Sequence, residues 1–224
     1  MAKKQNKSTA AGSTSSGQAE RVGIFGASGC GKTTKARELT AGLNRIVYFD
    51  PLQEIARERG IKPFRNFLQL KKALLDNFKR GFRFAFCPDF GSEIQQLNDL
   101  SYFLIELQRG YGSQHTAKIT LVVDELDVSF PSGILQKDRR NGFAFLSCRG
   151  RHSGINIIGI SQRMPLVDIT FRANCSALYI FRHTEPADIE VASRLLGREY
   201  KETFKKLNNY EYFYKQGSKI FLKS

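Results

Sequence analysis

Short apolar and β-branched runs alternate along the chain with segments whose apolar residues recur every three or four positions. The runs predict six strands, at residues 21–25, 45–49, 82–87, 119–123, 155–160 and 177–181. The run at 119–123 is almost continuously apolar, as in a parallel strand that is buried on both faces. The alternation of strands with helices predicts an α/β fold with a central, mostly parallel sheet flanked by helices.

The segments between the strands have the apolar spacing and the glycine or proline boundaries of helices. We predict helices over residues 34–42, 53–59, 67–78, 94–108, 137–149 and 186–196, and around 200–207. In this prediction, residues 137–149 form one basic helix. Residues 210–215 and 219–222 flank a Gln-Gly-Ser turn and predict a C-terminal β-hairpin.

The first 19 residues are mostly Lys, Ser, Thr, Gly, Ala and Gln. A segment of this composition cannot bury enough apolar surface to order itself. We therefore expect a disordered basic tail over residues 1–20, followed by one domain over residues 21–224, a length that suits a single core.

The chain of 224 residues carries a formal net charge of +14. This balance favours a polyanionic partner, nucleic acid first and an anionic membrane surface second, while a basic surface without such a partner stays open. The four cysteines and three histidines are scattered, so we expect free thiols in a reducing compartment and no Cys/His metal site. No apolar run approaches ~20 residues, and no apolar segment follows the N-terminal lysines. We therefore expect neither a transmembrane segment nor a secretory signal.

A glycine-rich loop with the sequence GASGCGKT joins the first predicted strand to the first predicted helix. Strand, loop and helix in this order are the context of a P-loop, whose backbone N–H groups and helix N-terminus bind phosphate. We expect Lys32 to reach the β- and γ-phosphates of ATP and the Thr33 hydroxyl to ligate Mg²⁺. The residues expected around the nucleotide are Gly26, Ala27, Ser28, Gly29, Cys30, Gly31, Lys32, Thr33 and Thr34.

Two acidic residues and one glutamine follow buried strands further along the chain. Asp124 and Glu125 end the strand at 119–123, and Gln162 follows the strand at 155–160. A P-loop enzyme needs an acid near Mg²⁺, which suits Asp124, and a base that activates water, which suits Glu125. Gln162 is placed to contact the γ-phosphate. A solvated turn for the acids and an ordinary polar strand end for Gln162 are the alternatives.

The order P-loop, intervening strand, Asp-Glu and Ser-Gln-Arg resembles the additional-strand catalytic-glutamate class of NTPases, the RecA/FtsK-like type. Residues 151–156, RHSGIN, and 161–165, SQRMP, resemble the R-x-x-G-[IV]-x and [ST]-Q-R-P patterns of the FtsK–HerA superfamily of DNA-pumping ATPases. Met164 departs from the second pattern, in which proline directly follows arginine. The stretches GRH, FR and EPAD at residues 150–152, 181–182 and 185–188 resemble the genome-packaging ATPases of tailless icosahedral viruses with an internal membrane.

This resemblance implies a ring, commonly a hexamer, in which an arginine of one subunit completes the neighbour's active site. Arg151 matches that arginine, and Arg149 is a rival. A helix-capping role for Arg151 stays open. Because Arg151 precedes the strand that leads to Gln162, we expect its guanidinium near the rim formed by the carboxyl ends of the strands. Asp50-Pro51, with Glu54, resembles the D-P motif of the superfamily, and a turn is the simplest interpretation.

Contact with double-stranded DNA is expected in the lumen of the ring. Lys137, Arg139 and Arg140 follow the acidic strand and are the candidate residues, although a solvated basic helix face is an equal alternative. Contacts from Lys and Arg to phosphates do not depend on base sequence, which suits a motor that moves any DNA.

The sequence thus predicts an ATP- and Mg²⁺-dependent motor that translocates double-stranded DNA. By resemblance, it packages a viral genome into a preformed capsid, acts at a capsid vertex or with membrane-associated virion proteins, and is found in the virion and the host cytoplasm. A filamentous-phage-type assembly or export ATPase is one alternative, although such proteins act with a transmembrane segment. A small-molecule kinase is another, although it has no clear use for Glu125, Gln162 or the net charge.

Overall fold

The computed structural model of the chain describes residues 20–111 and 117–224. Its centre is a nine-stranded sheet in the order β3-β4-β2-β5-β6-β1-β7-β8-β9. The strands β3 to β7 in that order run parallel, whereas β8 and β9 form an antiparallel hairpin at one edge. The strands are β1 (Arg21–Phe25), β2 (Arg45–Phe49), β3 (Pro63–Phe64), β4 (Phe82–Phe86), β5 (Ile119–Val123), β6 (Ile155–Ser161), β7 (Ala177–Phe181), β8 (Tyr212–Gln216) and β9 (Lys219–Lys223).

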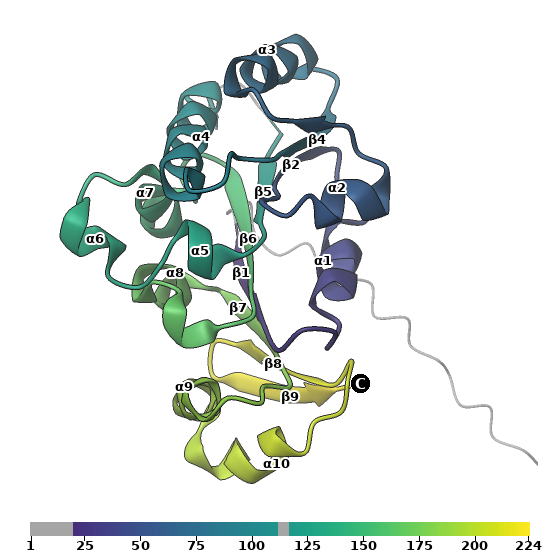
Figure 1. The fold of residues 1–224 in the computed structure, drawn as a ribbon, viewed down its shortest axis with the longest axis vertical. Coiled ribbons are helices and arrows are strands. Elements are labelled where there is room, and N and C mark those ends of the chain that lie inside the picture. Colours follow the sequence, from purple (N-terminus) through teal and green to yellow (C-terminus); the bar gives the residue numbers. More distant parts are fainter. Residues whose placement is uncertain (1–19, 112–116) are drawn as a thin grey trace, which may run out of the picture.

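Helices cover both faces of the sheet (Figure 1). They are α1 (Lys32–Thr40), α2 (Glu54–Arg59), α3 (Phe67–Asn77), α4 (Glu93–Leu107), α5 (Leu126–Ser129), α6 (Ile134–Lys137), α7 (Gly142–Arg149), α8 (Ile169–Asn174), α9 (Pro186–Leu196) and α10 (Lys201–Lys205). The larger apolar core lies between the sheet and the layer that contains α3, α4, α7 and α8, and the smaller core lies under α1 and α2. The predicted α/β architecture, with its parallel sheet and C-terminal hairpin, is confirmed.

All six predicted parallel strands are present, because their runs are apolar enough for a sheet covered on both faces. Every residue of β1, β2 and β5 is buried. The structure adds the two-residue strand β3 at one edge, which is too short to give a sequence pattern. It also adds the short helices α5 and α8. The hairpin strand β8 begins at Tyr212, slightly later than predicted.

The prediction of one helix over residues 137–149 is wrong. Helix α6 ends at Lys137, and α7 begins at Gly142. The side chain of Asn141 accepts hydrogen bonds from the backbone N–H groups of Phe143 and Ala144, so it caps the start of α7. The Asp138 carboxylate accepts from the backbone of Arg140, which stabilises a turn between the two helices.

The predicted tail falls largely on residues 1–19, which lie outside the described residues. Glu20 already extends the pairing of β1 with β6, because its carbonyl accepts a hydrogen bond from Ile157. Within the described part of the chain, no helix combines the length and the apolar character that crossing a membrane requires.

Candidate active site

The glycine-rich loop lies where β1 ends and α1 begins, at the carboxyl end of the parallel strands. Gly31 is the N-terminal cap of α1 and has φ 111°, a backbone conformation that favours glycine. A side chain at Gly26 would lie only 2.6 Å from Cys30 Sγ and from the Cβ of Phe181. The loop therefore needs glycine at one position for its turn and at the other for close packing against β7.

Lys32 and Thr33 form the start of α1, as a P-loop requires. Lys32 Nζ donates a hydrogen bond to the carbonyl of Ala27 at 2.9 Å, so the ammonium group lies over the loop. A hollow of about 150 Å³ beside the loop is lined by Gly29, Gly31, Lys32, Thr33, Thr34 and Tyr210. All of these residues except Tyr210 belong to the segment predicted to hold phosphates, and Tyr210 comes from far along the sequence.

The predicted acids lie one strand beyond β6, at the end of β5. Glu125 adopts φ 47°, an uncommon left-handed conformation for a residue with a side chain, at the N-terminus of α5. Gln162 Nε2 donates a hydrogen bond to Glu125 Oε1 at 3.1 Å. The sequence predicted these two residues independently, and the structure brings them into direct contact.

The two acids have perturbed proton affinities. Burial, helped by the neighbouring Glu125 carboxylate, raises the pKa of Asp124 to about 7. Burial also raises the pKa of Glu125, while the hydrogen bond from Gln162 opposes that shift. Perturbed carboxylates gathered beside a phosphate-binding loop are typical of a catalytic site.

The donor set fits Mg²⁺. Thr33 and Asp124 offer a hydroxyl and a carboxylate, the hard oxygen ligands that this ion prefers, and Mg²⁺ commonly takes only one or two protein ligands beside substrate phosphates. The buried, mutually repelling acids Asp124 and Glu125 would also be stabilised by a nearby cation. Thr33 and Asp124 are therefore the residues that would hold it.

Asp50 does not line the hollow beside the loop, but after the larger effect of burial its charge helps to raise the pKa of Asp124. It is fully buried at the end of β2, and its Oδ2 accepts a hydrogen bond from the Ala56 backbone N–H at 2.8 Å. The segment from Asp50 to Gln53 forms the turn into α2, in agreement with the interpretation of Asp50-Pro51 as a turn.

A second polar group lies beside the loop and was not predicted from the sequence. Arg163 Nε donates to Asp188 Oδ2 at 2.9 Å, and the buried His183 lies with Nδ1 3.9 Å from Asp188 Oδ1. Burial, with the positive charges of Lys32 and Arg163, lowers the pKa of His183 to about 4. These residues line a hollow of about 250 Å³ with Gln162, Ala27 and Ser28. Arg163 and Asp188 lie in the SQRMP and EPAD stretches that carry the resemblance, but sequence spacing does not show that they form an ion pair, because they come from separate segments of the chain.

The expected position of Arg151 is wrong. Arg151 follows α7 and precedes the first residue of β6, and β6 runs parallel to β1. It therefore lies at the amino end of the sheet, beside the guanidinium of Arg21 at the start of β1, whose pKa it helps to lower after the larger effect of burial. The seven residues of β6 separate it from the end that holds Gln162, a distance of roughly 20 Å. The direction of a strand decides which rim the residues before and after it occupy.

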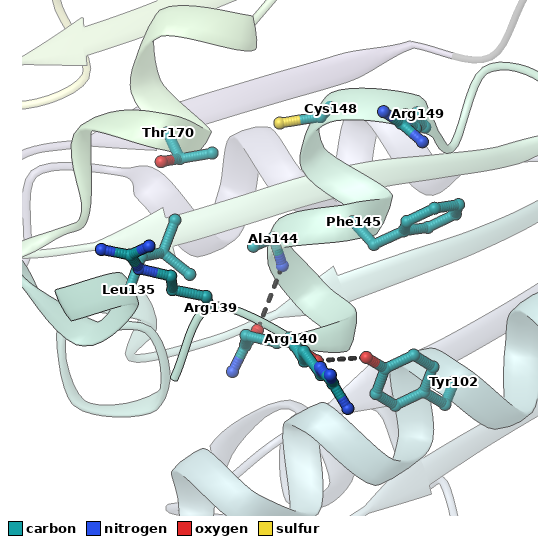
Figure 2. A pocket seen from close by; sticks show the side chains of 10 residues that line it. Tyr102, Leu135, Arg139, Arg140, Ala144, Phe145, Cys148, Arg149 and Thr170 are labelled. Carbon is teal, nitrogen blue, oxygen red and sulfur yellow. Dashed lines mark hydrogen bonds between the residues drawn. The ribbon is translucent and has the colours of Figure 1, made fainter. Parts of the chain in front are cut away.

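The other predicted basic residues lie on one side of the molecule. Arg139, Arg140 and Arg149 line a hollow of about 470 Å³ that runs along α7, together with Tyr102, Phe145 and Cys148 (Figure 2). Arg149 also lies over the Phe145 ring, with its guanidinium carbon 5.7 Å from the ring centre. Lys137, the last residue of α6, is exposed and does not line the hollow.

No protein-family model and no curated protein sequence matches the chain. Solved structures do. The genome-packaging NTPase B204 from Sulfolobus turreted icosahedral virus 2, in complex with ATP-gammaS, aligns with a TM-score of 0.71 and 15% identity, over 92% of this chain and 97% of that chain. The chain has the fold of B204. The resemblance seen in the P-loop and in residues 151–165 is thus confirmed at the level of the fold.

Two further ATPases align with lower TM-scores. EssC (ATPases 2 and 3) from Geobacillus thermodenitrificans aligns with a TM-score of 0.54 and 14% identity, over 91% of this chain and 39% of that chain. The cytoplasmic domain of the type VII secretion ATPase EccC from Thermomonospora curvata aligns with a TM-score of 0.55 and 14% identity, over 91% of this chain and 23% of that chain. The fold of this chain thus occurs in a genome-packaging NTPase and in other ATPases.

Proposed function

We propose that this protein is an ATP-hydrolysing motor that translocates double-stranded DNA and packages a viral genome into a preformed capsid. One observation carries the proposal: a P-loop, an Asp-Glu pair and a strand-end glutamine meet at one edge of a sheet that has the fold of a packaging ATPase over 92% of the chain. Fold likeness alone does not assign a function, so the chemistry of these residues supplies the rest of the support.

Each of these residues has a separate role in the proposed reaction. Lys32 and the loop from Gly26 to Thr34 bind the phosphates. Thr33 and Asp124 would hold Mg²⁺, which would supply positive charge to the phosphoryl group. Glu125 accepts a proton from the attacking water, and its raised pKa brings its proton affinity closer to that of a working general base. Gln162 positions the Glu125 carboxylate through their hydrogen bond, and because it lines a hollow with the loop residues Ala27 and Ser28, we assign it to the γ-phosphate.

We propose a homo-oligomeric ring, most simply a hexamer, in which Arg151 or Arg149 completes the neighbour's site. The arrangement supports a role between subunits rather than within one, because roughly 20 Å of β6 separate Arg151 from the catalytic rim of its own subunit. An arginine supplied in trans stabilises the charge on the transferred phosphoryl group, typically by about 10³- to 10⁵-fold in turnover.

The net charge of +14 supports DNA as the partner, with Lys137, Arg139 and Arg140 as phosphate contacts. All three are exposed, Lys137 at the end of α6 and the two arginines in the segment between α6 and α7. Within the same proposal, residues 1–20 form a basic tail, residues 21–224 form the motor domain, and the protein acts at the packaging vertex of the virion after synthesis in the host cytoplasm.

Stimulation of ATP hydrolysis by double-stranded DNA tests the proposal. We expect DNA of unrelated sequences to raise kcat to a similar extent. Lys32→Ala should lose ATP binding because a phosphate-paired charge is removed. Glu125→Gln should keep binding and lose turnover, because the shape is kept and the base is not. ATP hydrolysis that ignores DNA, together with phosphoryl transfer to a small acceptor, would instead indicate a kinase.

A further inference from the structure

Tyr210 lies against the P-loop although it is distant from Thr33 in the sequence. Its backbone N–H donates a hydrogen bond to the carbonyl of Cys30 at 2.8 Å, which ties the segment before β8 to the loop. Its ring covers Gly31: a Cβ atom added there would lie 2.8 Å from Tyr210 Cδ1. The loop and the aromatic ring are therefore in direct contact.

The backbone of Tyr210 is held in an unfavourable conformation. Its φ is 70°, and such left-handed geometry is uncommon for a residue with a bulky side chain. Neighbouring bonds keep the segment in place: Glu211 accepts from the backbone and the side chain of Asn208, and Arg182 donates to Asn209. Strain that is maintained by surrounding contacts is characteristic of functional sites.

Packing does not account for this strain, because the ring gains little burial from it. Tyr210 is 60% exposed, and it lines the 150 Å³ hollow together with Lys32, Thr33 and Thr34. One part of the ring thus rests on Gly31, while the remainder faces solvent at the side of the loop where α1 begins.

The order of the strands sets the direction in which a nucleotide would lie. Gln162 follows β6, and Tyr210 precedes β8, so they stand on opposite sides of the loop in the order β6-β1-β7-β8. Three strand spacings amount to roughly 14 Å, which is comparable with the length of a nucleoside triphosphate. With the terminal phosphate at Gln162 and Glu125, the base lies on the side of Tyr210.

We propose that Tyr210 is the base platform of the nucleotide site, a specificity residue on whose exposed face the nucleobase of the bound triphosphate stacks. This inference rests on the proposed function in one respect, the binding of a nucleoside triphosphate by the P-loop. Aromatic stacking accepts a base in any orientation of its hydrogen-bonding edge, so the platform adds affinity for a base-bearing ligand over a bare polyphosphate.

The test compares two ligands by calorimetric titration in the presence of Mg²⁺: ATP-gammaS, which carries a base, and inorganic tripolyphosphate, which does not. The variant is Tyr210→Asn, because asparagine tolerates left-handed backbone geometry and so removes the ring without adding strain. We expect Kd for ATP-gammaS to rise about 5- to 150-fold and Kd for tripolyphosphate to stay unchanged. Tyr210→Phe keeps the ring and should bind ATP-gammaS like the parent protein.

Equal weakening for both ligands in Tyr210→Asn would show that the ring only supports the loop, and an unchanged Kd for ATP-gammaS would show that the base lies elsewhere. Either result overturns the inference while leaving the proposed function in place. Failure of the parent protein to bind either ligand would overturn both.

Discussion

The amide nitrogen of Gln162 lies 3.1 Å from a carboxylate oxygen of Glu125 and donates a hydrogen bond to it. The bond joins the ends of the adjacent strands β5 and β6 at the rim where the P-loop lies. Any change in the position of Gln162 must therefore move or release the carboxylate that we propose as the base. This hydrogen bond is a direct physical connection between the residue that we propose as the phosphate sensor and the residue that we propose as the base.

Removal of the amide tests that connection. Gln162→Ala should lower kcat for ATP hydrolysis by about 100-fold, the usual cost of removing one positioned donor, while Kd for ATP changes little. Steady-state kinetics and equilibrium binding measure the two effects separately. Gln136→Ala, at an exposed position of α6, is the matched control and should behave like the parent protein. Parent-like kcat in Gln162→Ala would show that Glu125 needs no such support.

Complementation between inactive proteins tests the role of Arg151 in the neighbouring site. Arg151→Ala should bind ATP normally and lose about 10³-fold or more in turnover. Mixed with Lys32→Ala, which keeps the arginine but has no working site, it should regain some activity. An intact site then meets an intact arginine across an interface. If mixed rings form and stay inactive, the assignment to Arg151 fails, and Arg149 becomes the residue to substitute.

Salt dependence of DNA binding tests the basic segment between α6 and α7. Replacing Lys137, Arg139 and Arg140 by glutamine should reduce the slope of log K against log salt concentration by about 0.9 for each phosphate that the variant no longer neutralises. Affinity should fall to a similar extent for unrelated DNA sequences. Replacing Lys72, Lys79 and Arg80 on and after α3 removes the same charge elsewhere and serves as the control. An unchanged slope in the first variant would place the DNA-binding surface on another face.

Burial of His183 predicts acid sensitivity. Its pKa is about 4 in the folded protein and about 6.5 in an unfolded chain, so between these values the unfolded state binds more protons. The free energy of unfolding should therefore fall as the pH falls, by about 2 kcal/mol between pH 7 and pH 5 from this residue. Urea unfolding at both pH values measures it. His183→Phe should flatten this dependence, whereas His152→Gln, at an exposed histidine, should retain it.

The sequence predicts those parts of the site whose position depends only on the order of neighbouring elements along the chain. The P-loop, Asp124, Glu125 and Gln162 each directly follow an apolar strand, and parallel strands bring such ends to one rim. The sequence puts Arg151 at the wrong rim, because Arg151 precedes its strand, and only residues that follow parallel strands lie at their carboxyl ends. Residues 137–149 have the spacing of one helix, but the Asn141 side chain caps the start of α7 and so separates α7 from α6.

The remaining parts depend on contacts between segments that are distant in sequence. Tyr210 belongs to no motif, and only the return of the chain along β7 and β8 brings it to the P-loop. In the same way, Asp188 contacts Arg163 and His183 only because α9 packs beside Arg163 in the folded chain. Apolar periodicity carries no information about contacts between residues that are distant in sequence.

Displacement of a triplex-forming oligonucleotide from linear double-stranded DNA tests the central claim most directly, because a protein that moves along DNA strips the third strand from the duplex. We expect the parent protein to displace the oligonucleotide only with ATP and Mg²⁺, on DNA of unrelated sequences, and Glu125→Gln to bind DNA without displacing it. ATP hydrolysis by the parent protein that proceeds at full rate on this DNA without any displacement would contradict the proposal of a DNA-translocating motor.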